Sequence, residues 1–80
     1  MLSITGIPEK LLNYLDNRYE LQYSLYDYLY KNGYRDVKSV AVESYEIHAE
    51  KKEAEIGLVM ENGDKIIGIY GKEKNTYLFY

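Results

Sequence analysis

The spacing of apolar residues changes once along this chain, from a helical period before Gly33 to strand-like alternation after it. Residues 8–32 carry apolar side chains three or four positions apart, which predicts one long α-helix. Pro8 suits the first helical position, and at Asn32-Gly33 the glycine can adopt the left-handed conformation that ends a helix. A break near Asp16-Asn17 is the alternative to a continuous helix.

Apolar residues cover an unusually wide arc of the predicted helix. Placed at about 100° per residue, they span roughly 220°, about twice what one sheet face covers. One apolar stripe consists of Leu12, Leu15, Tyr19, Tyr23, Tyr26 and Tyr30. The adjoining stripe consists of Leu11, Tyr14, Leu21, Leu25, Tyr28 and Leu29. The two stripes therefore need two different surfaces to cover them.

We interpret one stripe as packing on the protein's own sheet and the other as contacting a second protein. Tyrosine is enriched at such interfaces because it combines a large apolar area, a polar tip and low rotamer entropy. The alternative is that some rings lie flat with their hydroxyl groups in water. The expected partner-binding residues of the helix are Tyr19, Tyr23, Tyr26, Tyr30, Arg18 and Gln22.

The second half of the chain predicts four β-strands, at about 37–48, 54–61, 64–70 and 76–80. Asn62-Gly63 between two β-like runs favours a two-residue hairpin loop. Residues 50–53 and 71–75 are the other two predicted loops. The predicted fold is α+β, in which one long N-terminal α-helix packs on a four-stranded antiparallel β-meander. Residues 1–80 would form a single small domain.

The two-residue loop sets the register of the central hairpin. It places Leu58 opposite Ile67 and Ile56 opposite Ile69, so that all four share one face. The neighbouring hairpins would place Tyr45 opposite Leu58 and Tyr77 opposite Ile69. The predicted core face then consists of Tyr45, Ile47, Ile56, Leu58, Ile67, Ile69, Tyr77 and Phe79. The opposite face would then carry Val59, Ile66, Tyr70, Leu78 and Tyr80.

Two features of this sheet remain open. Val40 and Val42 have the opposite parity to Tyr45 and Ile47, and a β-bulge near Glu43-Ser44 would bring all four to the core. Without a bulge, the two valines face outward. Residues 2–5 either add an edge strand or pack as an arm.

On the outer face, Gly57 is expected opposite Gly68. Such a glycine pair marks either a flat exposed patch or a seat for a partner's side chain. We therefore add Tyr70 and Tyr80 to the expected partner-binding residues.

The sequence contains no recognisable catalytic motif. The chain has one histidine and no cysteine, and its six glycines form no phosphate-binding loop. His48 is expected beside Glu46 and opposite Glu55, a trio that can bind a metal or relay a proton. On an exposed strand we interpret it as a solvated charge cluster. We predict no enzyme activity, no metal and no cofactor.

Size and charge restrict the class of protein further. A chain of 80 residues buries a small core, and without cysteine the usual remaining stabiliser is oligomerisation. A net charge of −3 argues against nucleic-acid binding. No apolar run is long enough to span a membrane, and the N-terminus does not resemble a signal peptide, so we expect a cytoplasmic protein.

The leading hypothesis is a non-enzymatic protein-binding module that forms a homodimer or docks on a larger host protein. The wealth of Lys, Tyr, Ile and Asn indicates an AT-rich genome. A phage or mobile-element protein that inhibits or adapts a host protein is therefore a special case of this hypothesis. The alternative is a binder of a small ligand or single-stranded nucleic acid, with exposed tyrosines as stacking platforms.

Overall fold

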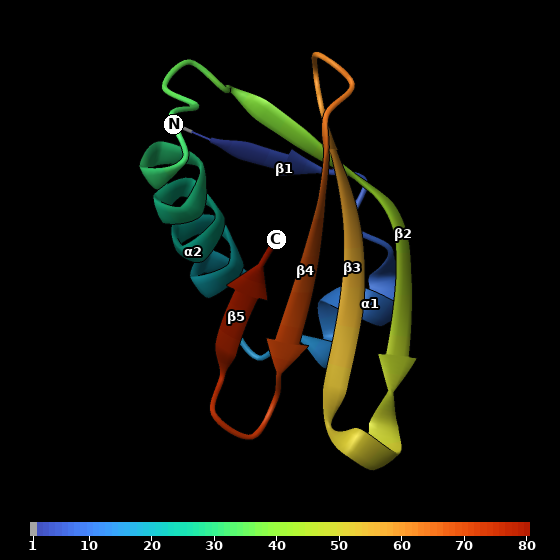
Figure 1. Cartoon of the computed structure of the whole chain (residues 1–80). Helices are drawn as coiled ribbons and strands as arrows, with labels where there is room; N and C mark the ends of the chain where they lie inside the picture. Colours follow the sequence, from blue (N-terminus) through green and yellow to red (C-terminus); the bar gives the residue numbers. More distant parts are fainter. Residues whose placement is uncertain (1) are drawn as a thin grey trace.

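Five strands form one sheet that is curled like half of a barrel, with helix α2 lying along its open side (Figure 1). The computed structural model describes residues 2–80, and Met1 lies outside the described residues. The strands are β1 (Ser3–Thr5), β2 (Ser39–His48), β3 (Glu53–Met60), β4 (Lys65–Gly71) and β5 (Thr76–Phe79). The helices are α1 (Glu9–Tyr14), α2 (Arg18–Lys31) and a short 3-10 helix, η1 (Ala49–Lys51). In residues 2–80, no helix is long and apolar enough to cross a membrane.

The sheet has one strand more than the sequence predicted. Its order is β1-β2-β3-β4-β5, and β1 pairs with β2 in parallel while the other pairs are antiparallel. The edge-strand alternative for residues 2–5 is therefore correct, and the four-stranded antiparallel meander was wrong in this respect. The parallel pairing follows from the two helices between β1 and β2, which carry the chain back to the start of β2.

The single helix expected over residues 8–32 is divided in two. Leu15 leaves the helical region with ψ at 130°, and Asn17 begins α2 by accepting a hydrogen bond from the main-chain N–H of Tyr19 at 2.9 Å. An asparagine side chain is among the strongest helix N-caps, which gives the local reason for a new start here. The break near Asp16-Asn17, the alternative, is therefore what the chain adopts.

The central hairpin is shifted by one residue from the predicted register. Leu58 lies opposite Ile66, not Ile67, because the loop contains three residues and closes with Met60 N–H donating to Asp64 O at 2.8 Å. Gly63 N–H donates to Met60 O, and Gly63 has a φ of 94°. A four-residue turn that ends in a glycine with positive φ is typical of a three-residue hairpin loop.

The shift reverses the face of β4 alone. Ile66 and Tyr70 are buried, whereas Ile67 and Ile69 lie on the outer, convex face. The next hairpin is shifted by one residue as well, with Tyr70 opposite Tyr77, and this second shift keeps Tyr77 and Phe79 on the core side. The prediction was therefore correct for the faces of β3 and β5 and wrong for β4.

The β-bulge is confirmed between Val42 and Ser44. Before it, Val40 is buried opposite Met60, and after it Tyr45 lies opposite Ile56 on the same side of the sheet. The pairing of Tyr45 with Leu58 was wrong by two positions, which leaves its face unchanged. Gly57 lies opposite Ser44 at the bulge and Gly68 lies opposite Phe79, so the two glycines do not oppose each other.

Helix α2 closes the core by joining the two edges of the sheet. Its ring of Tyr28 packs on Phe79 of β5 with centroids 5.7 Å apart, and its Gln22 donates a hydrogen bond to Leu2 O beside β1. The buried residues contributed by the helical segment are Leu11, Leu15, Leu21, Leu25 and Leu29.

Candidate functional site

Four tyrosines form an exposed stripe along α2. Tyr19, Tyr23, Tyr26 and Tyr30 keep between 51% and 63% of their surface in solvent, and we call them the tyrosine stripe. The adjoining leucines of the same helix are fully or almost fully buried. At about 100° per residue, the stripe is centred roughly 130° away from the buried leucines, so the protein's own sheet cannot cover it.

The break between α1 and α2 changes the membership of this stripe. Leu12 and Leu15 were expected to continue it, but Leu12 lies in α1 and Leu15 is buried in the core. In the helical segment, the exposed large apolar side chains therefore begin at Tyr19 and are all tyrosines.

Two arginines lie over the ends of the stripe. The guanidinium of Arg18 is 5.5 Å from the ring centroid of Tyr19, and that of Arg35 is 3.9 Å from the ring centroid of Tyr30. Arg35 also donates to the main-chain oxygen of Tyr30 at 2.8 Å. Within the stripe, Tyr26 and Tyr30 are stacked with centroids 6.3 Å apart. These contacts order the rings of Tyr19, Tyr26 and Tyr30 before any partner arrives, which lowers the entropy cost of binding.

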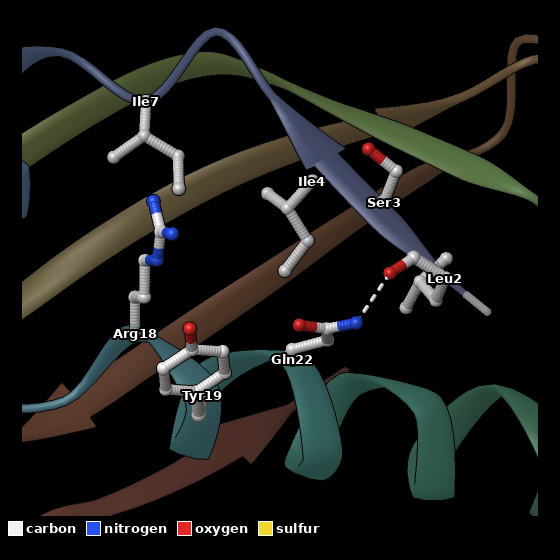
Figure 2. A pocket seen from close by; sticks show the side chains of 7 residues that line it. All are labelled: Leu2, Ser3, Ile4, Ile7, Arg18, Tyr19 and Gln22. Atoms are coloured by element: carbon white, nitrogen blue, oxygen red, sulfur yellow. Dashed lines mark hydrogen bonds between the residues drawn. The ribbon is translucent and has the colours of Figure 1, made fainter.

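A groove separates α2 from β1, and Figure 2 shows the side chains along it. One hollow of about 360 Å³ is lined by Ile4 and Ile7 on one side and by Arg18 and Tyr19 on the other. Gln22 bridges the two walls by donating to Leu2 O at 2.6 Å. The sequence did not predict this groove, because it forms only when β1 takes its place at the sheet edge.

Tyr70 does not join the expected surface. Its ring is fully buried, since the register of β4 turns it toward the core. Its hydroxyl oxygen accepts from the main-chain N–H of Asp16 at 3.3 Å, and the hydroxyl donates to Asn75 Oδ1 at 3.2 Å. Burial is the main reason why the pKa of Tyr70 is raised. Tyr70 is therefore a structural residue in this conformation.

Lys72 completes the support of the helix break. Its ammonium donates to Tyr14 O at 2.7 Å and to Asp16 Oδ1 at 3.0 Å, and it lies 4.6 Å from the ring centroid of Tyr14. The hydrogen bond with Asp16 is the main reason why the pKa of Lys72 is raised. Lys72, in the loop before β5, thus satisfies the free carbonyl of Tyr14 where α1 ends, and Tyr70 of β4 satisfies the N–H of Asp16.

Tyr80 is exposed, as predicted, but on a different side of the molecule from the helix. Phe79 points to the core, so the neighbouring Leu78 and Tyr80 point to the convex face of the sheet. Leu78 and Tyr80 are 65% and 63% exposed and lie opposite Ile69 and Ile67. A second apolar patch therefore lies on β4 and β5. Leu78 and Tyr80 belong to it as predicted, whereas Ile67 and Ile69 take the places expected for Ile66 and Tyr70.

The trio of Glu46, His48 and Glu55 is assembled on the outer face. Each residue offers one potential ligand atom, and these atoms lie within 4.8 Å of one another. Glu46 lies opposite Glu55, and His48 Nε2 is 3.7 Å from Glu46 Oε1. Both carboxylates are exposed, which is equally typical of a solvated charge cluster.

Comparison of the chain with protein-family models, with curated proteins and with solved structures gives no match.

Proposed function

We propose that this protein is a non-enzymatic protein-binding module that docks through the tyrosine stripe of α2. The observation that carries the proposal is the exposure of all four rings, each above 50%, along one face of a helix whose leucines are buried. Side chains of this kind dominate binding energy at protein interfaces.

The size of the stripe indicates that the interface extends beyond it. A buried aromatic side chain covers about 150–250 Å², so four half-exposed rings offer roughly 400 Å². A stable interface buries about 800 Å² on each partner. The stripe is thus about half of an interface, and a neighbouring surface must supply the rest.

The first partner we propose is a second copy of this chain, because 80 residues without cysteine form a small core that gains stability on association. Light scattering on purified protein at micromolar concentration should give twice the monomer mass. The double variant Tyr23→Ser, Tyr26→Ser should be monomeric and still folded. Lys31→Ser, on the polar side of α2, is the matched control and should leave the mass unchanged.

The second partner we propose for the stripe is a larger host protein. A phage or mobile-element protein that inhibits or adapts a host protein would use the stripe in this way, and the inferred AT-rich genome supports that special case. A photo-crosslinking amino acid at position 23 should capture the partner in cells, whereas the same probe at position 31, on the polar side of α2, should not. Equal capture at both positions would argue against docking through the stripe.

Single-stranded nucleic acid is the alternative occupant of the stripe. Arginines over Tyr19 and Tyr30 resemble the mixture of cations and aromatic rings that binds unpaired bases. Asp27 and Glu20 border the same helix face, and the net charge is −3. Both would repel a nucleic-acid backbone, so a protein partner is favoured over nucleic acid. Retention on an oligonucleotide column that decreases with salt would reverse this preference.

A further inference from the structure

The space between β1 and α2 opens again on the other side of Gln22. A second hollow of about 310 Å³ is lined by Leu2, Gln22, Tyr23 and Tyr26. Leu2 and Gln22 line both hollows, so the two lie end to end between β1 and α2, divided by the hydrogen bond from Gln22 to Leu2 O. We call this the β1–α2 groove. One of its walls is the edge strand β1, and the other is α2 with Tyr19, Tyr23 and Tyr26 of the tyrosine stripe.

The edge of β1 that faces the groove has backbone groups available for pairing. Ser3 N–H donates to Lys38 O at 2.9 Å, so Ser3 points toward β2. In a parallel ladder with Ser3 opposite Ser39, alternate residues face opposite edges, and the N–H and C=O of Ile4 therefore point away from β2. Leu2 O has the same orientation, and it accepts the bond from Gln22. An exposed strand edge of this kind is a template for another strand.

Arg18 places a positive charge at one end of the groove. Figure 2 shows its side chain directed from α2 toward Ile7, across the hollow. Among the side chains of residues 2–80, no carboxylate lies within 4 Å of its guanidinium, in contrast to Lys31, Lys65 and Lys72, which are paired. A planar donor fork beside an apolar floor matches a carboxylate carried by an otherwise apolar segment.

We propose that the β1–α2 groove binds an extended segment of a partner protein, which adds as a strand to β1 and presents an acidic side chain to Arg18. Alternate apolar side chains of the segment fill the two hollows on either side of Gln22. Its main-chain N–H takes over the bond that Leu2 O accepts from Gln22. This inference rests on the protein-binding role proposed above, and it supplies the remainder of the interface that the tyrosine stripe leaves open.

Charge and backbone chemistry favour this occupant over a partner helix. A helix satisfies its own N–H and C=O groups and would leave those of Ile4 unpaired, whereas a strand satisfies both. A basic segment would be repelled by Arg18. The recognised chemistry is therefore an extended peptide with apolar residues at alternate positions and an aspartate or glutamate among them.

The test uses the purified full chain and a phage-displayed library of random dodecapeptides. We expect selection of peptides with alternating apolar residues and an acidic side chain. A synthetic copy of a selected peptide, capped at both ends, should bind at least roughly tenfold more weakly to Arg18→Glu, because a charge-assisted hydrogen bond is lost. The same charge change in Lys31→Glu is the matched control and should leave binding unchanged. N-methylation of the peptide should weaken binding at alternate positions only, as strand pairing requires.

Several results would overturn the inference. Selected peptides without acidic residues, equal binding by wild type and Arg18→Glu, or equal sensitivity to N-methylation at every position would each contradict it. If no peptide is selected while the tyrosine variants still abolish the dimer, the groove proposal fails and the proposed function stands. If selected peptides bind in an Arg18-dependent manner but the tyrosine variants change neither mass nor crosslinking, the role of the stripe fails instead. Arg18-dependent binding of a single-stranded oligonucleotide, with no peptide selected, would assign the groove to nucleic acid.

Discussion

The hydroxyl group of Tyr70 accepts a hydrogen bond from the main-chain N–H of Asp16, 54 residues earlier in the chain, at 3.3 Å. This contact ties the break between α1 and α2 to strand β4. The ring of Tyr77 lies beside it, with the two centroids 4.8 Å apart, but its buried hydroxyl group has no hydrogen-bond partner in residues 2–80. The hydroxyl group of Tyr70 is thus hydrogen-bonded, whereas that of the neighbouring Tyr77 is buried without a partner.

Tyr70→Phe should destabilise the protein. It leaves the Asp16 N–H and the Asn75 side chain without their buried partner, which costs about 1–2 kcal/mol in free energy of unfolding. For a domain of this size, each kcal/mol corresponds to a decrease in melting temperature of roughly 4–8 °C. Calorimetry measures this shift directly.

Tyr77→Phe should leave the stability unchanged or raise it by up to about 1 kcal/mol, because it removes a buried hydroxyl that gains no hydrogen bond. The substitution is chemically identical to Tyr70→Phe, so each variant is the control of the other. Equal destabilisation of both would show that ring packing, not hydrogen bonding, dominates at the two positions.

Alkaline pH should destabilise the fold. Burial raises the pKa of Tyr77 above its ordinary value, and the pKa of Tyr70 is raised for the same main reason. Above about pH 10 an unfolded tyrosine loses its proton while the folded one keeps it, so the free energy of unfolding falls as pH rises. The stability that the protonated Tyr70 and Tyr77 contribute is fully present below about pH 10 and is lost as pH rises toward their pKa in the folded protein. Urea denaturation at a series of pH values measures the slope, which should be smaller in Tyr77→Phe.

The two faces of α2 should respond very differently to truncation. Leu25 is fully buried and Leu25→Ala should cost about 2–5 kcal/mol, whereas Tyr26→Ala, at the next residue, should cost about 0.5 kcal/mol in the monomer. Chemical denaturation at a concentration below that of any self-association makes the comparison. A large cost of Tyr26→Ala under that condition would place its ring in the monomer's own core.

Gly68 should tolerate no side chain. A Cβ there would lie 2.8 Å from Cε1 of Phe79, whose ring is held between Tyr28 and Tyr77. Gly68→Ala should therefore cost about 1–3 kcal/mol through overpacking. In the background of Phe79→Leu the cost should be smaller, which a double-mutant cycle detects. Gly71→Ala, in the same strand, is the control, because its Cβ would be 3.4 Å from Thr76 Oγ1.

Local patterns predicted much of this fold. The helical spacing separated Leu21, Leu25 and Leu29 from the tyrosine stripe, and the structure places these leucines inside and the stripe outside. Strand alternation gave the correct faces for β3 and β5, and the change of parity after Val42 indicated the bulge. In each case, neighbouring side chains along one element must point to fixed sides of it, whatever the rest of the chain does.

Contacts between distant segments decided the rest. The choice between a two-residue and a three-residue loop at Gly63 reversed the face of β4 and so moved Tyr70 from the expected surface to the core. The helix break is held by Lys72 and Tyr70, and the β1–α2 groove exists only because residues 3–5 pair with residues 39–41. The sequence by itself determined which face of each element is apolar, since that depends on local geometry. Only the tertiary structure decided registers, breaks and grooves, because their free energies arise from partners far along the chain.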